Sequence, residues 1–253
     1  MHMAELLVTT DGSIRYLTLN RPDKKNALND GLISGLKDSL QEAGHDDSLR
    51  AVVIQGAGAD FCSGADLGAL QKISESSYEE NLEDARSLMD LFILIRRTRV
   101  PVIAAVRGRA LAGGAGLATA CDIVLASENA RFGYPEVKIG FVPAMVMAIL
   151  RRNLPEKIAF EIATRGFDFD AATAREYCLV NRIFPDAELE SSVREFVSIY
   201  EKISRSAVEM TKRLLYDMDG LNFDTAISAG TEVNARARMT DDCKKGIARF
   251  LYK

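Results

Sequence analysis

Apolar and polar residues follow strand and helix periods along the first half of the chain. Residues 5–9 and 14–20 predict two strands joined by a turn at Asp11 and Gly12. Residues 28–43 predict an amphipathic helix, because apolar side chains recur at positions 28, 32, 33, 36 and 40. A second long helix is expected over residues 78–97. Its apolar side carries Leu82, Leu88, Leu91, Phe92 and Ile95.

Three continuous apolar runs, at residues 51–55, 102–106 and 123–126, predict strands of another kind. They lack the alternation of a half-exposed strand, so we expect both of their faces to be covered. Because strands alternate with helices over this part of the chain, the pattern indicates an α/β core.

Beyond Pro185 the pattern is purely helical. Four helices are expected there, with Gly220 and Gly246 as breaks. We therefore divide the chain into an α/β core of residues 1–195 and a helical region of residues 196–253, which packs on the core or on another subunit. The four expected helices cover residues 188–202, 204–216, 223–238 and 241–253.

Composition adds few constraints on partners. The 253 residues include 32 basic and 36 acidic side chains, for a net charge of −4, and 47% are hydrophobic. These values are ordinary for a soluble globular protein with a large core. The mild acidity gives no electrostatic reason to expect nucleic acid or an anionic membrane as a partner. The N-terminal pattern is not that of a secretory signal, and no apolar run could span a bilayer, so we expect a cytoplasmic protein.

The few histidines and the spacing of the cysteines exclude several kinds of catalytic site. The two histidines are His2 and His45, too few for a His-rich zinc site. A Ser-His-Asp triad would depend on His45, whose neighbours are typical of an exposed turn. No two of the four cysteines form a CxxC pair, which favours reduced thiols. We therefore expect no metal, and chemistry based on carboxylates, backbone amides or lysines. The cysteines are Cys62, Cys121, Cys178 and Cys243.

A first glycine segment, Gly56-Ala-Gly58, follows a buried strand and partly matches a dinucleotide fingerprint. The third glycine is replaced by Phe61, and the next helix begins only near Asp66, so the helix N-terminus cannot hold a pyrophosphate there. Asp66 is instead expected to cap the helix. The cap leaves the amide of Ala65 near a helix start, where it could face a ligand.

A second segment places Gly113, Gly114 and Gly116 at the start of a helix of small residues. Glycines there allow close packing of the helix against the sheet. They also leave a free amide at a helix N-terminus, pointed at a developing negative charge. The spacing alone does not separate these two explanations.

A third segment surrounds Glu136 with the apolar side chains of Phe132, Tyr134, Val137 and Phe141. Apolar surroundings should raise the pKa of this carboxyl group, which suits proton transfer near neutrality. The alternative is a first-turn glutamate after proline, which the helix dipole favours.

Together these segments resemble the crotonase (enoyl-CoA hydratase/isomerase) superfamily over essentially the whole chain. Residues 21–29 are similar to the family's CoA-binding segment, residues 61–67 and 112–116 to its two oxyanion-hole segments, and residues 132–136 to the segment with an acid/base glutamate. Residues 179–185 continue the match. The resemblance implies an α/β fold, a spiral of ββα turns, with a C-terminal helical region that forms trimers, often paired into hexamers.

The resemblance also implies roles for individual residues. The amides of Ala65 and Gly113 would bind the thioester oxygen and stabilise an enolate, and Glu136 would move the proton. The acyl-CoA thioester is then the substrate, coenzyme A is part of it, and no other cofactor is needed. We expect a homotrimer or a hexamer that is a dimer of trimers, acting in fatty acid metabolism. The residues expected to bind acyl-CoA are Lys25, Ala27, Ala65, Asp66, Leu67, Gly113 and Tyr134; Phe141, Met145, Met147 and the helix over residues 78–97 are expected to border the acyl pocket.

One departure concerns the reaction. Two-glutamate hydratases carry their second glutamate where this chain has Gly116. One carboxylate suffices to move a proton between C2 and C4, whereas water addition is normally shared between two. Resemblance to bacterial members favours an enoyl-CoA hydratase. A Δ3,Δ2-enoyl-CoA isomerase is the alternative, and an acyl-CoA-binding or RNA-binding protein without catalysis is an alternative of another class. The same amides would also serve decarboxylation or thioester hydrolysis.

Overall fold

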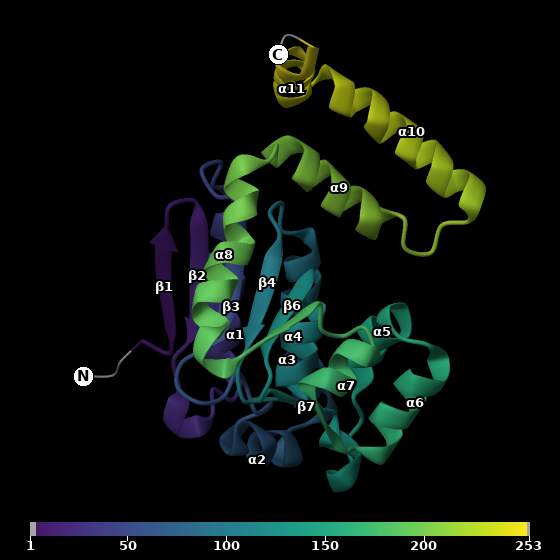
Figure 1. Cartoon of the computed structure of the whole chain (residues 1–253). Coiled ribbons are helices and arrows are strands. Elements are labelled where there is room, and N and C mark those ends of the chain that lie inside the picture. Colours follow the sequence, from purple (N-terminus) through teal and green to yellow (C-terminus); the bar gives the residue numbers. More distant parts are fainter. Residues whose placement is uncertain (1–3, 252–253) are drawn as a thin grey trace.

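The computed structural model describes residues 4–251, and a six-stranded sheet runs through the core (Figure 1). β1 (Leu6–Asp11) and β2 (Ile14–Leu19) form the expected antiparallel hairpin. The other strands add to β2 in parallel, in the order β1-β2-β3-β4-β6-β9. They are β3 (Ala51–Gly56), β4 (Val102–Val106), β6 (Ile123–Ser127) and β9 (Arg182–Phe184).

Each central strand is covered on both faces, as the continuous apolar runs predicted. Val52 and Ile54 of β3 belong to a core with α1 (Asp30–His45), α3 (Tyr78–Arg97) and α4 (Gly113–Ala120). The alternate residues, Ala51 and Val53, belong to a second core. This second core is closed by α8 (Leu189–Lys202), which contributes Leu189, Val193 and Val197. The long helices expected from the sequence are α1 and α3.

A second sheet of three strands was not predicted from the sequence. It has the order β5-β7-β8, with β5 (Arg109–Leu111), β7 (Arg131–Gly133) and β8 (Asp168–Asp170). β4 is followed by β5 and then α4, and β6 is followed by β7 and the 3₁₀ helix η2 (Pro135–Ile139), which gives successive ββα turns. β5 and β7 are parallel, with Leu111 opposite Gly133. The segments that lead to Gly113 and to Glu136 therefore leave neighbouring strands at the same edge.

Shorter helices gather near the end of the sheet where these segments lie (Figure 1). Among the described residues, no helix combines the length and the apolar character needed to cross a membrane. The shorter helices are η1 (Pro22–Lys24), α2 (Leu67–Glu75), α5 (Ala144–Asn153), α6 (Glu156–Arg165), α7 (Ala171–Glu176) and η3 (Asp186–Glu188).

The last three helices form a C-terminal arm, Arg205 to Leu251, at the opposite end of the sheet (Figure 1). With α8 they match the four helices expected from the sequence. They are α9 (Arg205–Asp217), α10 (Phe223–Met239) and α11 (Asp241–Leu251). The described parts of α10 and α11 bury no side chain. The division of the chain at residue 195 stays a prediction, and α8 spans that position.

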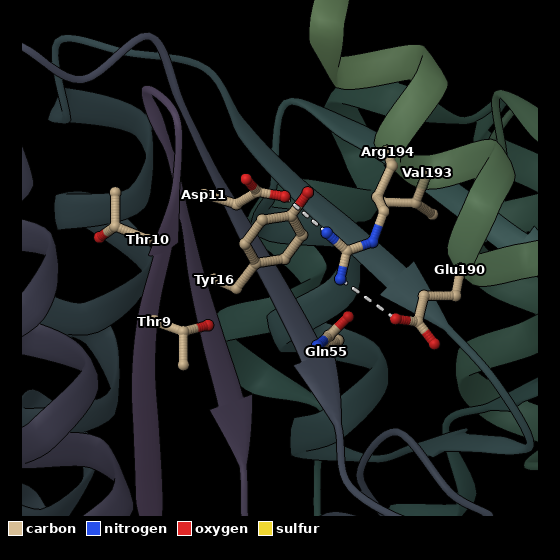
Figure 2. A pocket seen from close by; sticks show the side chains of 8 residues that line it. All are labelled: Thr9, Thr10, Asp11, Tyr16, Gln55, Glu190, Val193 and Arg194. Atoms are coloured by element: carbon tan, nitrogen blue, oxygen red, sulfur yellow. Dashed lines mark hydrogen bonds and ion pairs between the residues drawn. The ribbon is translucent and has the colours of Figure 1, made fainter.

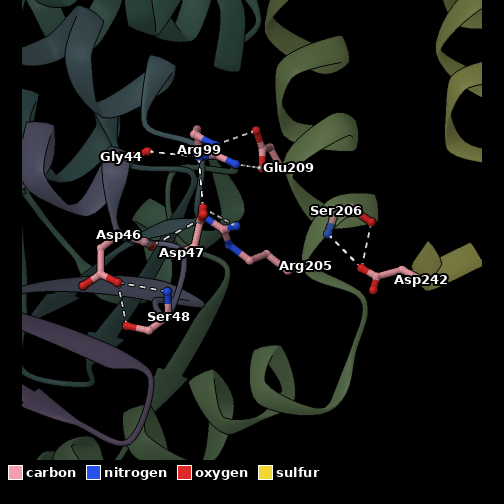
Figure 3. Close-up of polar contacts among 9 residues, drawn as sticks. All are labelled: Gly44, Asp46, Asp47, Ser48, Arg99, Arg205, Ser206, Glu209 and Asp242. Carbon is pink, nitrogen blue, oxygen red and sulfur yellow. Dashed lines mark hydrogen bonds and ion pairs between the residues drawn. The ribbon is translucent and has the colours of Figure 1, made fainter. Parts of the chain in front are cut away.

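Polar contacts attach the arm to the core (Figure 3). Arg99 pairs with Glu209 at 2.7 Å, and Arg205 pairs with Asp47 at 2.8 Å. Asp242 of α11 accepts hydrogen bonds from the hydroxyls of Ser206 and of Ser204, the residue that caps α9, each at 2.7 Å. The arm is therefore held through ion pairs and hydrogen bonds, in contrast to the apolar face of α8.

Candidate active site

Two glycine segments bring Ala65 and Gly113 close together. A Cβ on Gly64 would lie 2.9 Å from Cβ of Ala112 and 3.7 Å from the backbone nitrogen of Gly113. Gly64 also has φ +99°, which favours glycine. Only a residue without a side chain allows this approach, which places the residue after Gly64 beside the start of α4.

The amide of Ala65 is left free by the pairing of its neighbours. Leu28 donates its N–H to the carbonyl of Gly64 at 2.7 Å, and Asp66 donates its N–H to the carbonyl of Leu28 at 3.2 Å. Parallel pairing of this kind engages the residues on either side of Ala65, so the N–H of Ala65 points the other way. No acceptor for it occurs within residues 4–251. Asp66 caps α2, as predicted, by accepting from the N–H of Gly68 at 2.7 Å.

The amide of Gly113 is free because this residue begins α4. Ala112, which precedes it, has φ +49° and ψ −124°, a strained conformation for a residue with a side chain. The N–H of Ala112 donates to the carbonyl of Gly133 at 2.9 Å and holds it there. A Cβ on Gly114 would lie 2.2 Å from the carbonyl oxygen of Cys62. Both explanations of the glycines therefore hold: Gly114 serves close packing, and Gly113 supplies a free amide.

Glu136 lies at the first turn of η2, directly after Pro135. Its side chain is buried, with 9% of the residue exposed, and its Oε2 has no hydrogen-bond partner among the described residues. Burial raises the pKa of the Glu136 carboxyl above its ordinary value, because the charged form loses water. A buried carboxyl with an unoccupied oxygen is suited to accept and return a proton.

Gly116 faces apolar side chains. A Cβ at this position would lie 2.9 Å from Cγ2 of Val146 and 3.0 Å from Cζ of Phe92. Phe92 comes from α3 and Val146 from α5, and both are buried. The space beside Gly116 is therefore filled, and a larger side chain there requires these two to move. The sequence placed Phe92 on the inner side of its helix but gave no signal for the contact with Gly116.

The predicted CoA-binding residues gather around one loop. Arg21 donates to the carbonyl of Ala27 at 2.6 Å and to the carboxylate of Asp66 at 2.7 Å. The ion pair with Arg21 lowers the pKa of Asp66. Lys25 has φ +50°, and its carbonyl accepts from the N–H of Ser63 at 3.0 Å. Lys25, Ala27, Ala65 and Asp66 thus lie on connected segments, while the side chain of Leu67 lies outside the described residues.

The sequence did not reveal that Arg21 and Asn26 hold this loop in place. Asn26 is fully buried with φ +54°, and its amide donates to the carbonyls of Ala57 and Asp60 at 2.9 and 2.7 Å. Asparagine tolerates this left-handed conformation better than most residues, which is the signal that could have identified it.

The residues expected to border the acyl pocket differ in exposure. Tyr134 is fully buried, Phe141 is exposed, and Met145 and Met147 are partly buried. Their contact with an acyl chain, and the catalytic roles of Ala65, Gly113 and Glu136, stay predictions.

Other polar features lie away from Glu136. A cavity of about 330 Å³ between the hairpin and α8 is lined by Tyr16, Gln55 and Arg194 (Figure 2). Arg194 donates there to Asp11 and Glu190, at 2.6 and 3.2 Å. Within residues 4–251, no three His, Cys, Asp or Glu side chains are grouped so that they could hold a metal ion.

Comparisons with known proteins agree with this architecture. The sequence profile of the family described as enoyl-CoA hydratase/isomerase matches residues 9–253. A Thermus thermophilus protein provisionally named enoyl-CoA hydratase is 38% identical over 242 residues, covering 96% of both chains. The 2,3-dehydroadipyl-CoA hydratase of Escherichia coli is 33% identical over 253 residues, covering 99% of this chain and 97% of the relative.

Solved structures give the same result for the fold. An enoyl-CoA hydratase from Mycobacterium smegmatis superposes with a TM-score of 0.94 at 31% identity, over 98% of this chain and 96% of that one. Human enoyl-CoA hydratase domain-containing protein 3 gives a TM-score of 0.93 at 26% identity, over 98% and 97%. The predicted crotonase-like spiral with C-terminal helices is confirmed. The chain belongs to the enoyl-CoA hydratase/isomerase family.

Proposed function

We propose that this protein adds water to 2-enoyl-CoA thioesters to give 3-hydroxyacyl-CoA. The observation that carries the proposal is the free amides of Ala65 and Gly113 beside the segment of the buried Glu136. The hydratase names of the relatives support water addition as the reaction.

The mechanism uses the amides as an oxyanion hole. The thioester oxygen accepts hydrogen bonds from Ala65 and Gly113, and the positive end of the α4 dipole adds to their effect. Glu136 takes a proton from water, and the oxygen of that water forms a bond to C3. The electron pair of the C2–C3 double bond moves toward the thioester and gives an enolate. Glu136 then returns the proton to C2, which completes the addition with one carboxyl group.

Substrate binding in this proposal relies on the loop around Arg21. Lys25 and Ala27, with the backbone of residues 65–67 and Gly113, line the path of coenzyme A, and Tyr134 lies toward the acyl group. Coenzyme A is part of the substrate, so the mechanism calls for no separate cofactor. We place the enzyme in the cytoplasm and in fatty acid metabolism.

Isomerisation is the second candidate reaction, and the surroundings of Gly116 favour it. Phe92 and Val146 fill the space where a second carboxylate would be needed. Glu136 would then remove a proton from C2 of a 3-enoyl-CoA and return it to C4, so the double bond moves between C3–C4 and C2–C3.

The test measures loss of the conjugated enoyl-thioester absorbance with crotonyl-CoA and longer 2-enoyl thioesters. Glu136→Gln should remove activity while circular dichroism shows an unchanged fold. Turnover of a 3-enoyl-CoA without turnover of any 2-enoyl-CoA assigns the isomerase. Binding of thioesters without any turnover assigns the non-catalytic alternative, and full activity in Glu136→Gln refutes the catalytic role of this residue.

We infer that the protein assembles as a homotrimer or as a dimer of trimers, with a second copy of this chain covering the arm. The arm exposes several large apolar side chains, and large exposed apolar patches mark interaction sites. Ile247→Asp should shift the mass seen by light scattering toward the monomer, while Lys244→Asp, on the same helix, should not. The exposed apolar residues are Phe223, Ile227, Met239, Ile247, Phe250 and Leu251.

A further inference from the structure

The segment that carries Glu136 has a buried hydroxyl contact with α4. Tyr134 is fully buried, and its hydroxyl lies 3.3 Å from Oγ1 of Thr119. Thr119 is itself buried and belongs to the last turn of α4. A tyrosine hydroxyl normally finds a partner when it is buried, and here that partner comes from the helix that begins at Gly113.

The direction of this hydrogen bond follows from the donors available. Thr119 has one hydroxyl hydrogen, and its Oγ1 lies 2.8 Å from the carbonyl oxygen of Ala115, which can only accept. The hydrogen of Thr119 therefore goes to Ala115. Tyr134 must then donate to Thr119, so the two hydroxyls form a chain that ends on the backbone of α4.

The Glu136 segment is thus tied to α4 at two points. The carbonyl of Gly133 accepts from the N–H of Ala112 at 2.9 Å, next to the start of the helix. The hydroxyl of Tyr134 reaches Thr119, seven residues after Ala112 and about 10 Å further along the axis at roughly 1.5 Å of rise per residue. One contact leaves a segment free to pivot, whereas two separated contacts fix its orientation.

We propose that Tyr134, through Thr119, is a positioning residue that holds Glu136 in a fixed relation to the free amide of Gly113. The inference rests on the proposed function of the same site. Tyr134 acts through the backbone of its own segment, because Pro135 alone separates it from Glu136 and restricts the connection. The role differs from the acyl contact expected from the sequence, since it uses the hydroxyl and not an exposed ring.

Loss of the hydroxyl chain should change catalysis more than binding. The ring of Tyr134 still fills its space in Tyr134→Phe, but the segment can pivot about the contact at Gly133. Displacement of the carboxyl relative to the reacting carbons lowers kcat. Phenylalanine keeps the ring that is expected to lie toward the acyl group, and the loop around Arg21, which is expected to bind coenzyme A, is not touched, so KM should stay unchanged.

The kinetic experiment compares Tyr134→Phe and Thr119→Val with Thr119→Ser, which keeps the hydroxyl. We expect kcat to fall about tenfold in the first two variants, as misplacement of a catalytic group does. Thr119→Ser should stay near wild type. The variant that combines Tyr134→Phe with Thr119→Val should have the same kcat as the slower of the two single variants, because both changes remove the same contact. Tyr200 belongs to α8 and packs against the second core, on the other face of the sheet. Tyr200→Phe is therefore the control for loss of a tyrosine hydroxyl. Unchanged kcat in Tyr134→Phe, or independent effects that multiply in the double variant, would overturn the inference.

Titration of the Glu136 carboxyl, which needs no substrate, tests the positioning role of Tyr134 independently of the proposed reaction. Burial raises the pKa of Glu136, and a pivoting segment admits water, so this pKa should fall toward its ordinary value in Tyr134→Phe and Thr119→Val. Carbon-13 NMR of labelled glutamate carboxyls, assigned with Glu136→Gln, follows the titration. If wild type converts no enoyl thioester, the proposed reaction fails while the titration still decides the positioning role. The same pKa for Glu136 in wild type and both variants refutes that role.

Discussion

Lys212 of α9 and Asp122 form a buried ion pair, with the ammonium nitrogen 2.7 Å from the carboxylate. The ammonium also donates to the carbonyls of Ile95 and Val100, each at 2.9 Å. The other carboxylate oxygen accepts from the hydroxyl of Tyr216 at 2.7 Å. Lys212 is the residue that α9 buries, so this group is the inner anchor of the arm.

Removal of either partner of the Lys212–Asp122 pair should lower the free energy of unfolding substantially. Lys212→Met leaves the carboxylate of Asp122 in the interior without its countercharge, and such changes cost about 3–5 kcal/mol. Urea unfolding followed by circular dichroism measures the loss. The exposed ion pair of Arg213 and Asp217 on the same helix is the control, since Arg213→Met should change stability by less than about 1 kcal/mol. Equal effects in the two variants would contradict the assignment of an anchor.

Asn26 should not tolerate aspartate. In Asn26→Asp the two carbonyls of Ala57 and Asp60 lose their donor and face a buried negative charge. Aspartate accepts the same left-handed backbone, so the change isolates the hydrogen bonds. We expect a loss of about 3 kcal/mol or more in the free energy of unfolding, and a higher KM for acyl-CoA.

The matched control for Asn26 is Asn20→Asp. Asn20 donates one exposed hydrogen bond, to the carbonyl of Ala4. Its substitution should leave KM unchanged. A KM in Asn26→Asp equal to that of wild type would separate this loop from coenzyme A binding.

The raised pKa of Glu136 predicts opposite effects on activity and stability. The carboxylate must be ionised to accept a proton, so kcat/KM should fall as pH drops through a pKa above that of ordinary glutamate.

The effect on stability has the opposite sign. Folding disfavours the charged form of Glu136, so this residue lowers the free energy of unfolding once the pH rises past the glutamate pKa of the unfolded chain. Glu136→Gln should therefore be more stable than wild type at pH 7, and this gain should disappear below about pH 4. Thermal unfolding at both pH values tests the sign; a Glu136→Gln variant less stable than wild type at pH 7 contradicts it.

Two glycines of α4 should respond differently to alanine. At Gly114 the new Cβ meets a backbone carbonyl oxygen at 2.2 Å, which cannot move without the chain. At Gly116 it meets the ends of Val146 and Phe92, which can rotate. Gly116→Ala should cost about 1–3 kcal/mol through overpacking, and Gly114→Ala should cost more. Val146→Ala should recover part of the loss at Gly116 and none at Gly114, as measured by urea unfolding.

Low pH should release α11 from α9. Hydrogen bonds from Ser204 and Ser206 lower the pKa of Asp242 to about 2, well below the ordinary pKa of an aspartate. Because the folded pKa is the lower one, the stabilisation is present above the unfolded pKa and is lost as pH falls from about 4 toward 2. Asp242→Asn should produce at pH 7 the rise in hydrogen exchange of α11 that wild type shows only in acid. Asp241→Asn, its neighbour, is the control, and an equal rise in both variants would contradict the prediction.

Much of the fold could be predicted because long periodic segments carry enough pattern. The hairpin, the doubly covered strands β3, β4 and β6, and the long helices α1 and α3 each extend over several alternations or turns. The strands β5, β7 and β8 have three residues each, too few to show a period, and they were missed. This small sheet nevertheless sets the segment that leads to Glu136 beside the start of α4, through the bond from the N–H of Ala112 to the carbonyl of Gly133.

The sequence by itself determined the family, the positions of the two glycine segments and the identity of the buried glutamate, because these depend on local pattern and residue type. Tertiary structure alone decided which groups meet. The contacts of Tyr134 with Thr119, of Gly116 with Phe92 and Val146, and of Lys212 with Asp122 join residues from separate elements. Such contacts depend on the packing of whole helices against the sheet, which no local spacing encodes.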